Sequence, residues 1–263
     1  MERISLEKYV EKLASRGQHH FTTSEAVKAM RSTPIAVRAS LRRSRQKGRI
    51  ATPHRGFYII IPYEYRSLGC LPAEQFVPQL MDHLGKPYYT GLLSAAQFHG
   101  AAHQKPQDFQ VVVSTNRPEI RCGKVLVRFV ARRNAAEVTT ELVNTARGML
   151  RISSPEATAF DLVGYPDHCG GLSNVATVLG ELSERLRPDR LLQESVLSPL
   201  PWAQRLGFLL DRVGAVTLTE AISTRVHAEA DAYVPLRVGW SASAASRDSR
   251  WKILVNEKVE PDL

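Results

Sequence analysis

The segment between residues 33 and 55 carries the side chains best suited to contact a polyanion. Cationic side chains recur there at helical spacing, a hydroxyl stands near the start, and a histidine and an arginine follow in a short turn. Lysine and arginine bind phosphates, and arginine can also donate two hydrogen bonds to a guanine edge in the major groove. The sequence therefore predicts a surface that contacts double-stranded DNA. Its candidate residues are Thr33, Arg38, Arg42, Arg43, Arg45, Lys47, His54 and Arg55.

The net charge of the chain is concentrated around this segment. The 263 residues include 35 Lys and Arg against 26 Asp and Glu, which gives a formal net charge of +9. Residues 1–62 hold thirteen of the cations and four of the acids, so the remaining residues are neutral in sum. A basic block beside a balanced remainder is typical of proteins that bind polyanions. A solvated basic face that only aids solubility would give the same composition.

Residues 1–62 have the pattern of three helices followed by a β-hairpin, which is the order of a winged helix-turn-helix module. Apolar residues at helical spacing mark the first helix, and hydroxyl caps open the other two. The third helix begins after Thr33, has a proline in its first turn, and runs to Gly48. Two short strands then flank a turn at residues 53–56.

The third helix separates apolar from basic side chains. At about 100° per residue, Val37 and Leu41 share one side, while arginines and glutamine lie largely opposite or beside them. A recognition helix needs such a face, with donors long enough to reach base edges. Ser44 falls on the buried stripe, where an apolar residue is expected.

The chain after residue 62 predicts a connecting segment and a second domain. Residues 63–72 form the connecting segment, and residues 73–263 form a C-terminal domain in which several helices alternate with short strands. The expected fold class is α+β, with an N-terminal winged helix-turn-helix followed by a mixed α/β domain that contains a small sheet.

A second group of cations lies between residues 116 and 134. On the strand expected at 125–130, apolar side chains can pack on one face while charge is presented on the other. This basic ribbon could add phosphate contacts, bind RNA or bind a nucleotide, or it could be a solvated face. Its members are Arg117, Arg121, Lys124, Arg128, Arg132 and Arg133.

The second domain shows no catalytic constellation. A nucleotidyltransferase would need a Gly-Ser turn and closely spaced aspartates that hold metal ions, but the sequence contains neither a Gly-Ser dipeptide nor Asp-x-Asp. His99 and His103 have a metal-ligand spacing, yet Gly100 predicts that the helix ends there, which favours a capping or surface role. His168 and Cys169 are neighbours without an identifiable base partner. We expect no catalytic residue, no metal and no cofactor.

The cysteines and the hydropathy pattern indicate a cytoplasmic protein. The three cysteines are widely spaced and form no Cys-x-x-Cys pair, which argues against a disulfide framework. No apolar run approaches the roughly 18 residues of a membrane-spanning helix, and we expect no membrane contact.

Several stretches of the second domain recur in the order and spacing of a known family. They follow an N-terminal module that ends in Arg55-Gly56-Phe57-Tyr58. The stretches are Tyr88–Gly100, Gln104-Lys105-Pro106 before the strand at 109–113, Ser153–Leu162, Gln204–Leu210 and Trp251–Asn256. Over nearly its whole length the chain thus resembles the AbiEi antitoxin family, the antitoxins of type IV abortive-infection toxin–antitoxin pairs.

The resemblance implies two roles. The N-terminal module would bind repeats in its own promoter and repress its operon. The C-terminal domain would counter a nucleotidyltransferase-like toxin, and in this family the two proteins are commonly thought to act without a tight complex.

Two other readings of the sequence remain open. An enzyme would join the winged helix to a nuclease or nucleotide-modifying domain, and its activity would depend on acids such as Glu156, Asp161 or Asp211. A one-component transcription factor would instead have a C-terminal domain that senses a small ligand.

Overall fold

The computed structural model describes residues 4–101 and 106–262, and its mixture of helices and strands confirms the α+β class. Contacts divide the chain into two compact units. Unit 1 comprises residues 1–88, 107–131 and 142–151, and unit 2 comprises residues 89–106, 132–141 and 152–263.

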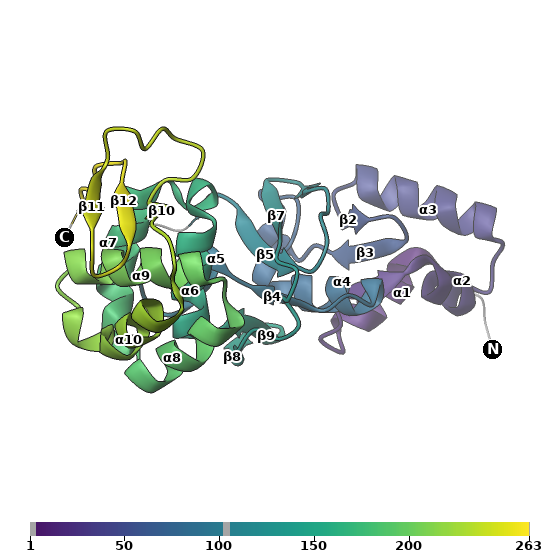
Figure 1. Ribbon diagram of the computed structural model, residues 1–263. Helices are drawn as coiled ribbons and strands as arrows, with labels where there is room; N and C mark the ends of the chain where they lie inside the picture. The colour runs from purple at the N-terminus through teal and green to yellow at the C-terminus, as the bar shows by residue number, and fades with distance from the viewer. Residues whose placement is uncertain (1–3, 102–105, 263) are drawn as a thin grey trace. The chain divides into compact units, whose positions relative to one another are not determined.

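Unit 1 begins with three helices and a hairpin, in the order that the sequence predicts. We call residues 4–62 the N-terminal module. A three-stranded antiparallel sheet of order β1-β3-β2 packs with the helices. In Figure 1 no other element of unit 1 covers the side of α3 that faces away from this sheet. The elements are α1 (Leu6–Ala14), β1 (His20–Thr22), α2 (Thr23–Met30), α3 (Pro34–Gln46), β2 (Ile50–His54) and β3 (Phe57–Ile60).

Side-chain caps fix where the helices of this module begin. The Thr22 hydroxyl accepts a hydrogen bond from the backbone N–H of Glu25, and the Glu25 carboxylate accepts one from the Thr22 N–H, which forms a capping box. The Thr33 hydroxyl accepts from the Ala36 N–H at 3.3 Å, with Pro34 in the first turn of α3. The hydroxyl caps expected from the sequence are therefore present.

The hairpin is buried on both of its faces. Tyr58 and Ile60 pack with the helices of the N-terminal module, whereas Phe57, Ile59 and Ile61 belong to a second core. Successive side chains of a strand point to opposite faces, so this division follows from the period of two. The second core continues through residues 70–129. The domain limits expected at residues 62 and 72, on either side of the connecting segment, remain predictions.

The rest of unit 1 supplies that second core. Strand β5 pairs parallel with β7 over five residues, and β6 pairs antiparallel with β7. Leu80 and Met81 of α4 are fully buried against them. The elements are η1 (Tyr63–Tyr65), η2 (Ala73–Gln75), α4 (Val77–Leu84), β5 (Phe109–Val113), β6 (Ile120–Cys122) and β7 (Val125–Ala131).

Unit 2 is built around a helix that has no solvent-exposed face. Helix α6 is buried at every residue from Pro155 to Val163, because α5, α7, α8 and α9 all contact it. Its elements are α5 (Leu92–Phe98), α6 (Pro155–Gly164), η3 (Pro166–Cys169), α7 (Leu172–Leu182), η4 (Ser183–Arg185), α8 (Pro188–Leu197), α9 (Leu200–Arg212), η5 (Val216–Leu218), α10 (Glu220–Glu229), β10 (Val234–Pro235), β11 (Ser246–Asp248) and β12 (Ile253–Val255).

Three further strands have residues in the ranges of both units. They are β4 (Tyr88–Thr90), β8 (Thr140–Thr145) and β9 (Gly148–Ser153), and β4 pairs parallel with β9 through Thr90 and Ile152. None of the helices in the described ranges has the length and apolar character needed to cross a membrane.

Candidate nucleic-acid interface

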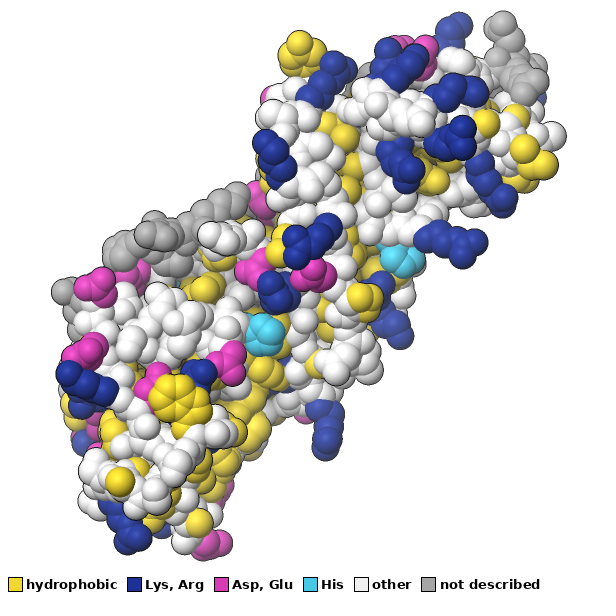
Figure 2. Space-filling model, turned by 90° about the horizontal axis from the view of Figure 1, so that it is seen from above, with side chains coloured by type: hydrophobic (Ala, Val, Ile, Leu, Met, Phe, Trp, Pro, Cys, Tyr) yellow, Lys and Arg dark blue, Asp and Glu magenta, His cyan; other side chains and the backbone are white. Residues whose placement is uncertain are grey.

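Helix α3 exposes every candidate residue that the sequence placed on it. Only Val37 and Leu41 of this helix are buried. Lysine and arginine side chains gather over the face of unit 1 that carries α3 (Figure 2). The exposed candidates are Thr33, Arg38, Arg42, Arg43, Arg45 and Lys47.

The helical period sorts the side chains outside the buried stripe of α3 into three rows. The row opposite the buried stripe contains Ile35, Ala39, Arg42 and Gln46; one flank contains Arg38 and Arg45; the other contains Ser40, Arg43 and Lys47. The helix contains no acid. Ile35, missing from the sequence-based set, is 79% exposed in the outer row, where an apolar side chain could meet a thymine methyl group.

The flank of Ser40, Arg43 and Lys47 borders a hollow beside the start of α1, which we call the α1–α3 hollow. It has a volume of about 250 Å³, and Ser44 contributes to its wall. Glu7 pairs with Arg49, which leaves the hollow with a positive balance. The hollow is lined by Ser5, Leu6, Glu7, Ser40, Arg43, Ser44, Lys47 and Arg49.

This setting suits a phosphate group. Cations and hydroxyls surround the hollow, and the first backbone N–H groups of α1 lie beside it. It also explains Ser44: this residue is half-buried beside a polar hollow, so the apolar side chain expected there is not needed. Arg49 was missed by sequence reasoning because it lies beyond the end of α3.

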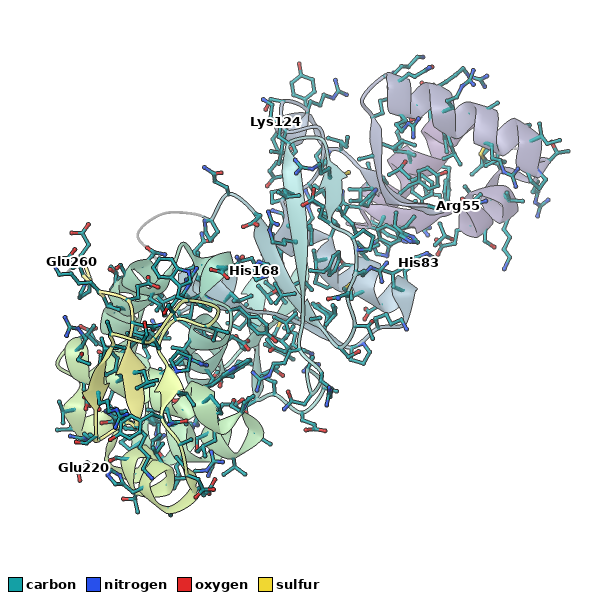
Figure 3. All side chains as sticks on the ribbon, turned by 45° about the horizontal axis from the view of Figure 1, so that its top comes forward. Arg55, His83, Lys124, His168, Glu220 and Glu260 are labelled. Carbon is teal, nitrogen blue, oxygen red and sulfur yellow. The ribbon has the colours of Figure 1, made fainter. Side chains whose placement is uncertain are left out.

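The turn between β2 and β3 presents Arg55 but not His54. Arg55 is exposed, and Gly56 adopts a φ of +83° that favours glycine (Figure 3). His54 still belongs to β2, is half-buried, and has its ring centroid 6.3 Å from that of His83. Burial, with Arg117 adding to the effect, lowers the pKa of His54. The expectation that His54 projects from the turn is therefore wrong.

The predicted basic ribbon does not form one exposed surface. Arg117, Arg121, Lys124 and Arg128 belong to unit 1, whereas Arg132 and Arg133 belong to unit 2. Within unit 1, Arg128 pairs with Asp108, Arg121 with Glu119, and Arg117 lies over the Phe129 ring. Lys124 and Arg133 are exposed.

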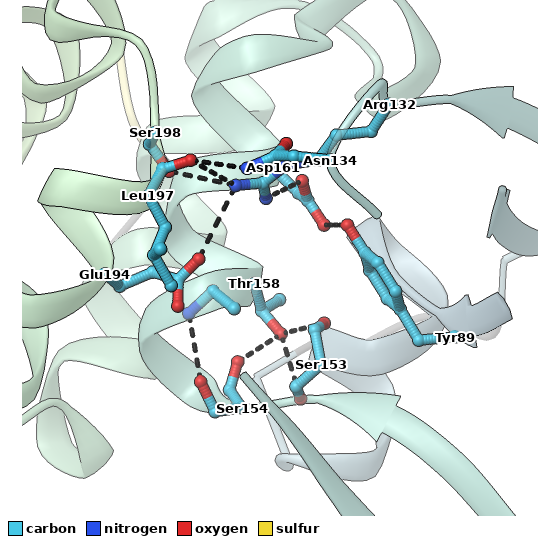
Figure 4. A network of polar contacts seen from close by, with 11 residues as sticks. Tyr89, Arg132, Asn134, Ser153, Ser154, Thr158, Asp161, Glu194, Leu197 and Ser198 are labelled. Carbon is cyan, nitrogen blue, oxygen red and sulfur yellow. Dashed lines mark hydrogen bonds and ion pairs between the residues drawn. The ribbon is translucent and has the colours of Figure 1, made fainter. Parts of the chain in front are cut away.

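Arg132 was wrongly placed in that ribbon, because its side chain is buried. Its side chain is 2% exposed, and its Nη1 donates to Asp161 Oδ1 at 2.8 Å (Figure 4). Nε donates to Asn134, and Nη2 donates to Ser198 and lies 3.5 Å from Glu194 Oε1. A buried guanidinium with these partners is unavailable to a nucleic acid. Sequence reasoning missed it because its main partner is distant along the chain.

Arg132 joins three buried groups in unit 2, which we call the Arg132 network: Arg132, Asp161, Glu194 and Tyr89. Tyr89 donates from its hydroxyl to Asp161 Oδ2 at 2.8 Å, and both side chains are fully buried. Burial raises the pKa of Asp161 and of Glu194, although Arg132 acts to lower both. Burial also raises the pKa of Tyr89 well above its ordinary value, with Asp161 adding to the rise.

The acids named for an enzymatic role are all engaged in internal contacts. Asp161 belongs to the Arg132 network. Glu156 Oε1 accepts from the Arg187 backbone N–H at 3.1 Å, and Asp211 accepts from the Trp251 indole N–H at 2.7 Å and from a threonine hydroxyl. These contacts hold helices and strands together within unit 2.

The histidines considered for chemistry have structural surroundings. His99 is the C-cap of α5 and is buried, with Nε2 2.8 Å from the Ser153 carbonyl oxygen; His103 lies outside the described residues. His168 and Cys169 lie in η3, where Cys169 is buried. Within residues 4–101 and 106–262, no cluster of His, Cys, Asp and Glu could hold a metal ion.

Comparison with protein families identifies the central part of the chain. Residues 89–212 match the model described as the AbiEi antitoxin C-terminal domain. The chain carries an AbiEi antitoxin domain. The match begins at Tyr89 and ends with α9, so it includes all four members of the Arg132 network. It confirms the resemblance to the AbiEi family, supports an antitoxin role in a toxin–antitoxin system, and implies a toxin partner.

Comparison with solved structures shows the fold of the whole chain. The crystal structure of the RV2827C protein from Mycobacterium tuberculosis is similar to it with a TM-score of 0.69 and 18% sequence identity. The alignment covers 96% of this chain and 92% of that one. A search of curated proteins found no match to the chain.

Proposed function

We propose that this AbiEi-type antitoxin is also a DNA-binding autorepressor whose N-terminal module is a winged helix-turn-helix. The observation that carries the proposal is α3, which has no acid and exposes four arginines around a narrow buried stripe, with Lys47 exposed at its C-cap. Such a helix can enter the major groove, and basic flanks can contact phosphates on both sides.

The rows of α3 suggest a division of labour on DNA. Arg42 and Gln46, in the outer row, can hydrogen-bond to base edges, and Ile35 can contact a thymine methyl group. Arg43 and Lys47 border the α1–α3 hollow, which suits a backbone phosphate. Arg55, on the turn of the hairpin, can reach the backbone or the minor groove.

The antitoxin role is assigned to the C-terminal domain. We propose that it counters a nucleotidyltransferase-like toxin and that the DNA target is a set of repeats in the protein's own promoter. The test of antitoxicity described below also measures whether the antitoxin and the toxin form a complex.

The test of DNA binding compares variants with equal changes of charge. The double variant Arg38→Gln/Arg42→Gln is titrated against DNA from upstream of its own gene and against a shuffled duplex, at several salt concentrations. The control is Arg187→Gln/Arg190→Gln on unit 2, where the two arginine side chains are 62% and 50% exposed. We expect at least tenfold weaker promoter binding in the first variant only. Equal binding by all three proteins would refute the assignment.

The test of antitoxicity uses the same variants in cells that express the neighbouring toxin gene. If the two roles reside in different parts of the chain, Arg38→Gln/Arg42→Gln derepresses the promoter but still restores growth when the antitoxin is supplied from another promoter. Loss of growth rescue in this variant, with normal protein levels, would contradict the separation. Co-purification of the two proteins reports whether they form a complex.

A ligand-responsive transcription factor is the second candidate. A polar hollow in unit 1, lined by residues of the N-terminal module and by Arg147, favours it over an enzyme. It predicts that a small molecule changes promoter affinity, which the titration above measures when repeated with that molecule present.

A further inference from the structure

Unit 1 contains a second hollow, lined by no residue of α3, which we call the Arg16–Arg147 hollow. It has a volume of about 260 Å³ and lies where the turn between α1 and β1 meets η2, α4 and the turn between β8 and β9. It is lined by Arg16, Gly17, Gln18, His19, His20, Leu71, Gln75, Phe76, Gln79 and Arg147. Seven of these ten side chains are charged or polar.

The charge of this hollow is positive. Arg16 and Arg147 are in its wall, and no acid is. Arg147 is held in place, since its Nε donates to Gln75 Oε1 at 2.8 Å and its Nη2 lies 3.6 Å from a Glu64 carboxylate oxygen. That carboxylate is 60% exposed, so solvent weakens its neutralising effect. An anion in the hollow would face two guanidinium groups.

The hollow also contains hydrogen-bonding atoms without partners among the described residues. Nδ1 of His19 and Oε1 of Gln79 are both buried and make no hydrogen bond. Burial lowers the pKa of His19, and Arg147 lowers it further, which favours the neutral ring. Buried polar atoms normally have a partner, and a carbonyl oxygen such as that of Gln79 requires a donor.

We propose that the Arg16–Arg147 hollow binds a small hydroxylated oxyanion. The arginines would bind its phosphate or carboxylate group, and its hydroxyl groups would donate to Gln79 and exchange a hydrogen bond with His19. The volume limits the ligand to about the size of a sugar phosphate. The site is separate from the proposed DNA surface and does not depend on DNA binding.

Occupation of this site would connect segments far apart in the sequence. Arg16 follows α1 of the N-terminal module, and Arg147 lies between β8 and β9. A ligand held by both would stabilise unit 1 in proportion to its occupancy. It would thereby give the N-terminal module a way to respond to a metabolite.

Isothermal titration calorimetry on the full chain without DNA tests the proposal. The probes are ribose 5-phosphate, gluconate and inorganic phosphate, at constant ionic strength. We expect ribose 5-phosphate or gluconate to bind with a dissociation constant below about 1 mM, and inorganic phosphate to bind at least tenfold more weakly. Which of the two hydroxylated probes binds more tightly identifies the phosphate or the carboxylate as the preferred group.

Four single variants distinguish a built site from general attraction to a basic protein. Arg16→Gln and Arg147→Gln should each weaken binding at least tenfold, while Arg66→Gln, an exposed arginine of the same unit outside the hollow, should leave it unchanged. Gln79→Leu should reduce the preference for the hydroxylated probes over inorganic phosphate. Absence of saturable binding by any probe, or an equal loss in Arg66→Gln, would overturn the proposal. Neither result would affect the DNA titrations.

Discussion

Replacement of Arg132 by methionine should destabilise unit 2 strongly. The substitution keeps an unbranched side chain of similar length but leaves Asp161, fully buried, and Glu194, 2% exposed, without their cation. Removing one partner of a buried ion pair costs about 3–5 kcal/mol, because the remaining charge is left without compensation. For a unit of this size that loss lowers the melting temperature by about 6–20 °C.

Tryptophan fluorescence reports this unfolding selectively. The three tryptophans, Trp202, Trp240 and Trp251, all belong to unit 2. Denaturant titrations at neutral pH should show the loss in Arg132→Met, whereas Arg133→Met, at the exposed neighbouring position, should stay within about 0.5 kcal/mol of the wild type. A loss below about 1 kcal/mol in Arg132→Met would refute the view that this ion pair holds unit 2 together.

The stability of Arg132→Met should also depend on pH. The ordinary pKa values of Asp161 and Glu194 are 3.8 and 4.5, and burial raises both in the folded state. Their protonation therefore favours folding at low pH, and this contribution is lost as the pH rises through the folded pKa values. Because Arg132 lowers the pKa of Asp161, removal of Arg132 raises that pKa further in the folded state. The loss of unfolding free energy in Arg132→Met, relative to the wild type, should therefore grow from about pH 4 toward neutral pH. A deficit independent of pH would contradict this reasoning.

Three further substitutions test other parts of the structure. Lys47→Gln should weaken binding to promoter and shuffled duplexes alike and reduce the salt slope by about one, since it removes one phosphate contact; an effect on the promoter alone would contradict its place beside the α1–α3 hollow. In the wild type, replacement of the contacted thymine by uracil should weaken DNA binding by up to about 1 kcal/mol, because one methyl contact is lost. In Ile35→Ala the same replacement should have no effect, and a wild type that does not respond would refute the contact. Gly207→Ala places a Cβ atom 2.1 Å from the buried Trp251 ring, so it should lower the free energy of unfolding by about 1–3 kcal/mol, and an unchanged midpoint in tryptophan fluorescence would contradict that packing.

The three helices and the hairpin of the N-terminal module could be predicted because their signals are local. Hydroxyl caps, a proline in the first turn and a 3.6-residue apolar period lie within a few residues of the helices they define. The continuous apolar run Phe57–Ile61 carried one more signal, since strands buried on both faces lose the alternation of apolar and polar residues. That run could have indicated a second core beyond the helices.

The features that escaped prediction are short strands and contacts between distant residues. Strand β6 has only three residues, too few for a clear pattern of alternation, although Gly123-Lys124 forms a two-residue turn between it and β7. The short strands β1, β4, β8, β10 and β11 were also missed. Arg132 looked like one more exposed cation of a strand, because nothing near it in the sequence indicates that Asp161 and Glu194 surround it.

Salt dependence of promoter binding tests the central claim most directly. The proposed DNA contacts come from the exposed, acid-free α3, whose Arg43 and Lys47 border the α1–α3 hollow, and from Arg55 on the hairpin. If roughly five or six phosphates are neutralised, the logarithm of the association constant should fall with the logarithm of salt concentration at a slope of about −5. Arg38→Gln/Arg42→Gln should make that slope less negative, and Arg187→Gln/Arg190→Gln should leave it unchanged. A slope near zero, or one that the α3 variant does not alter, would contradict the account.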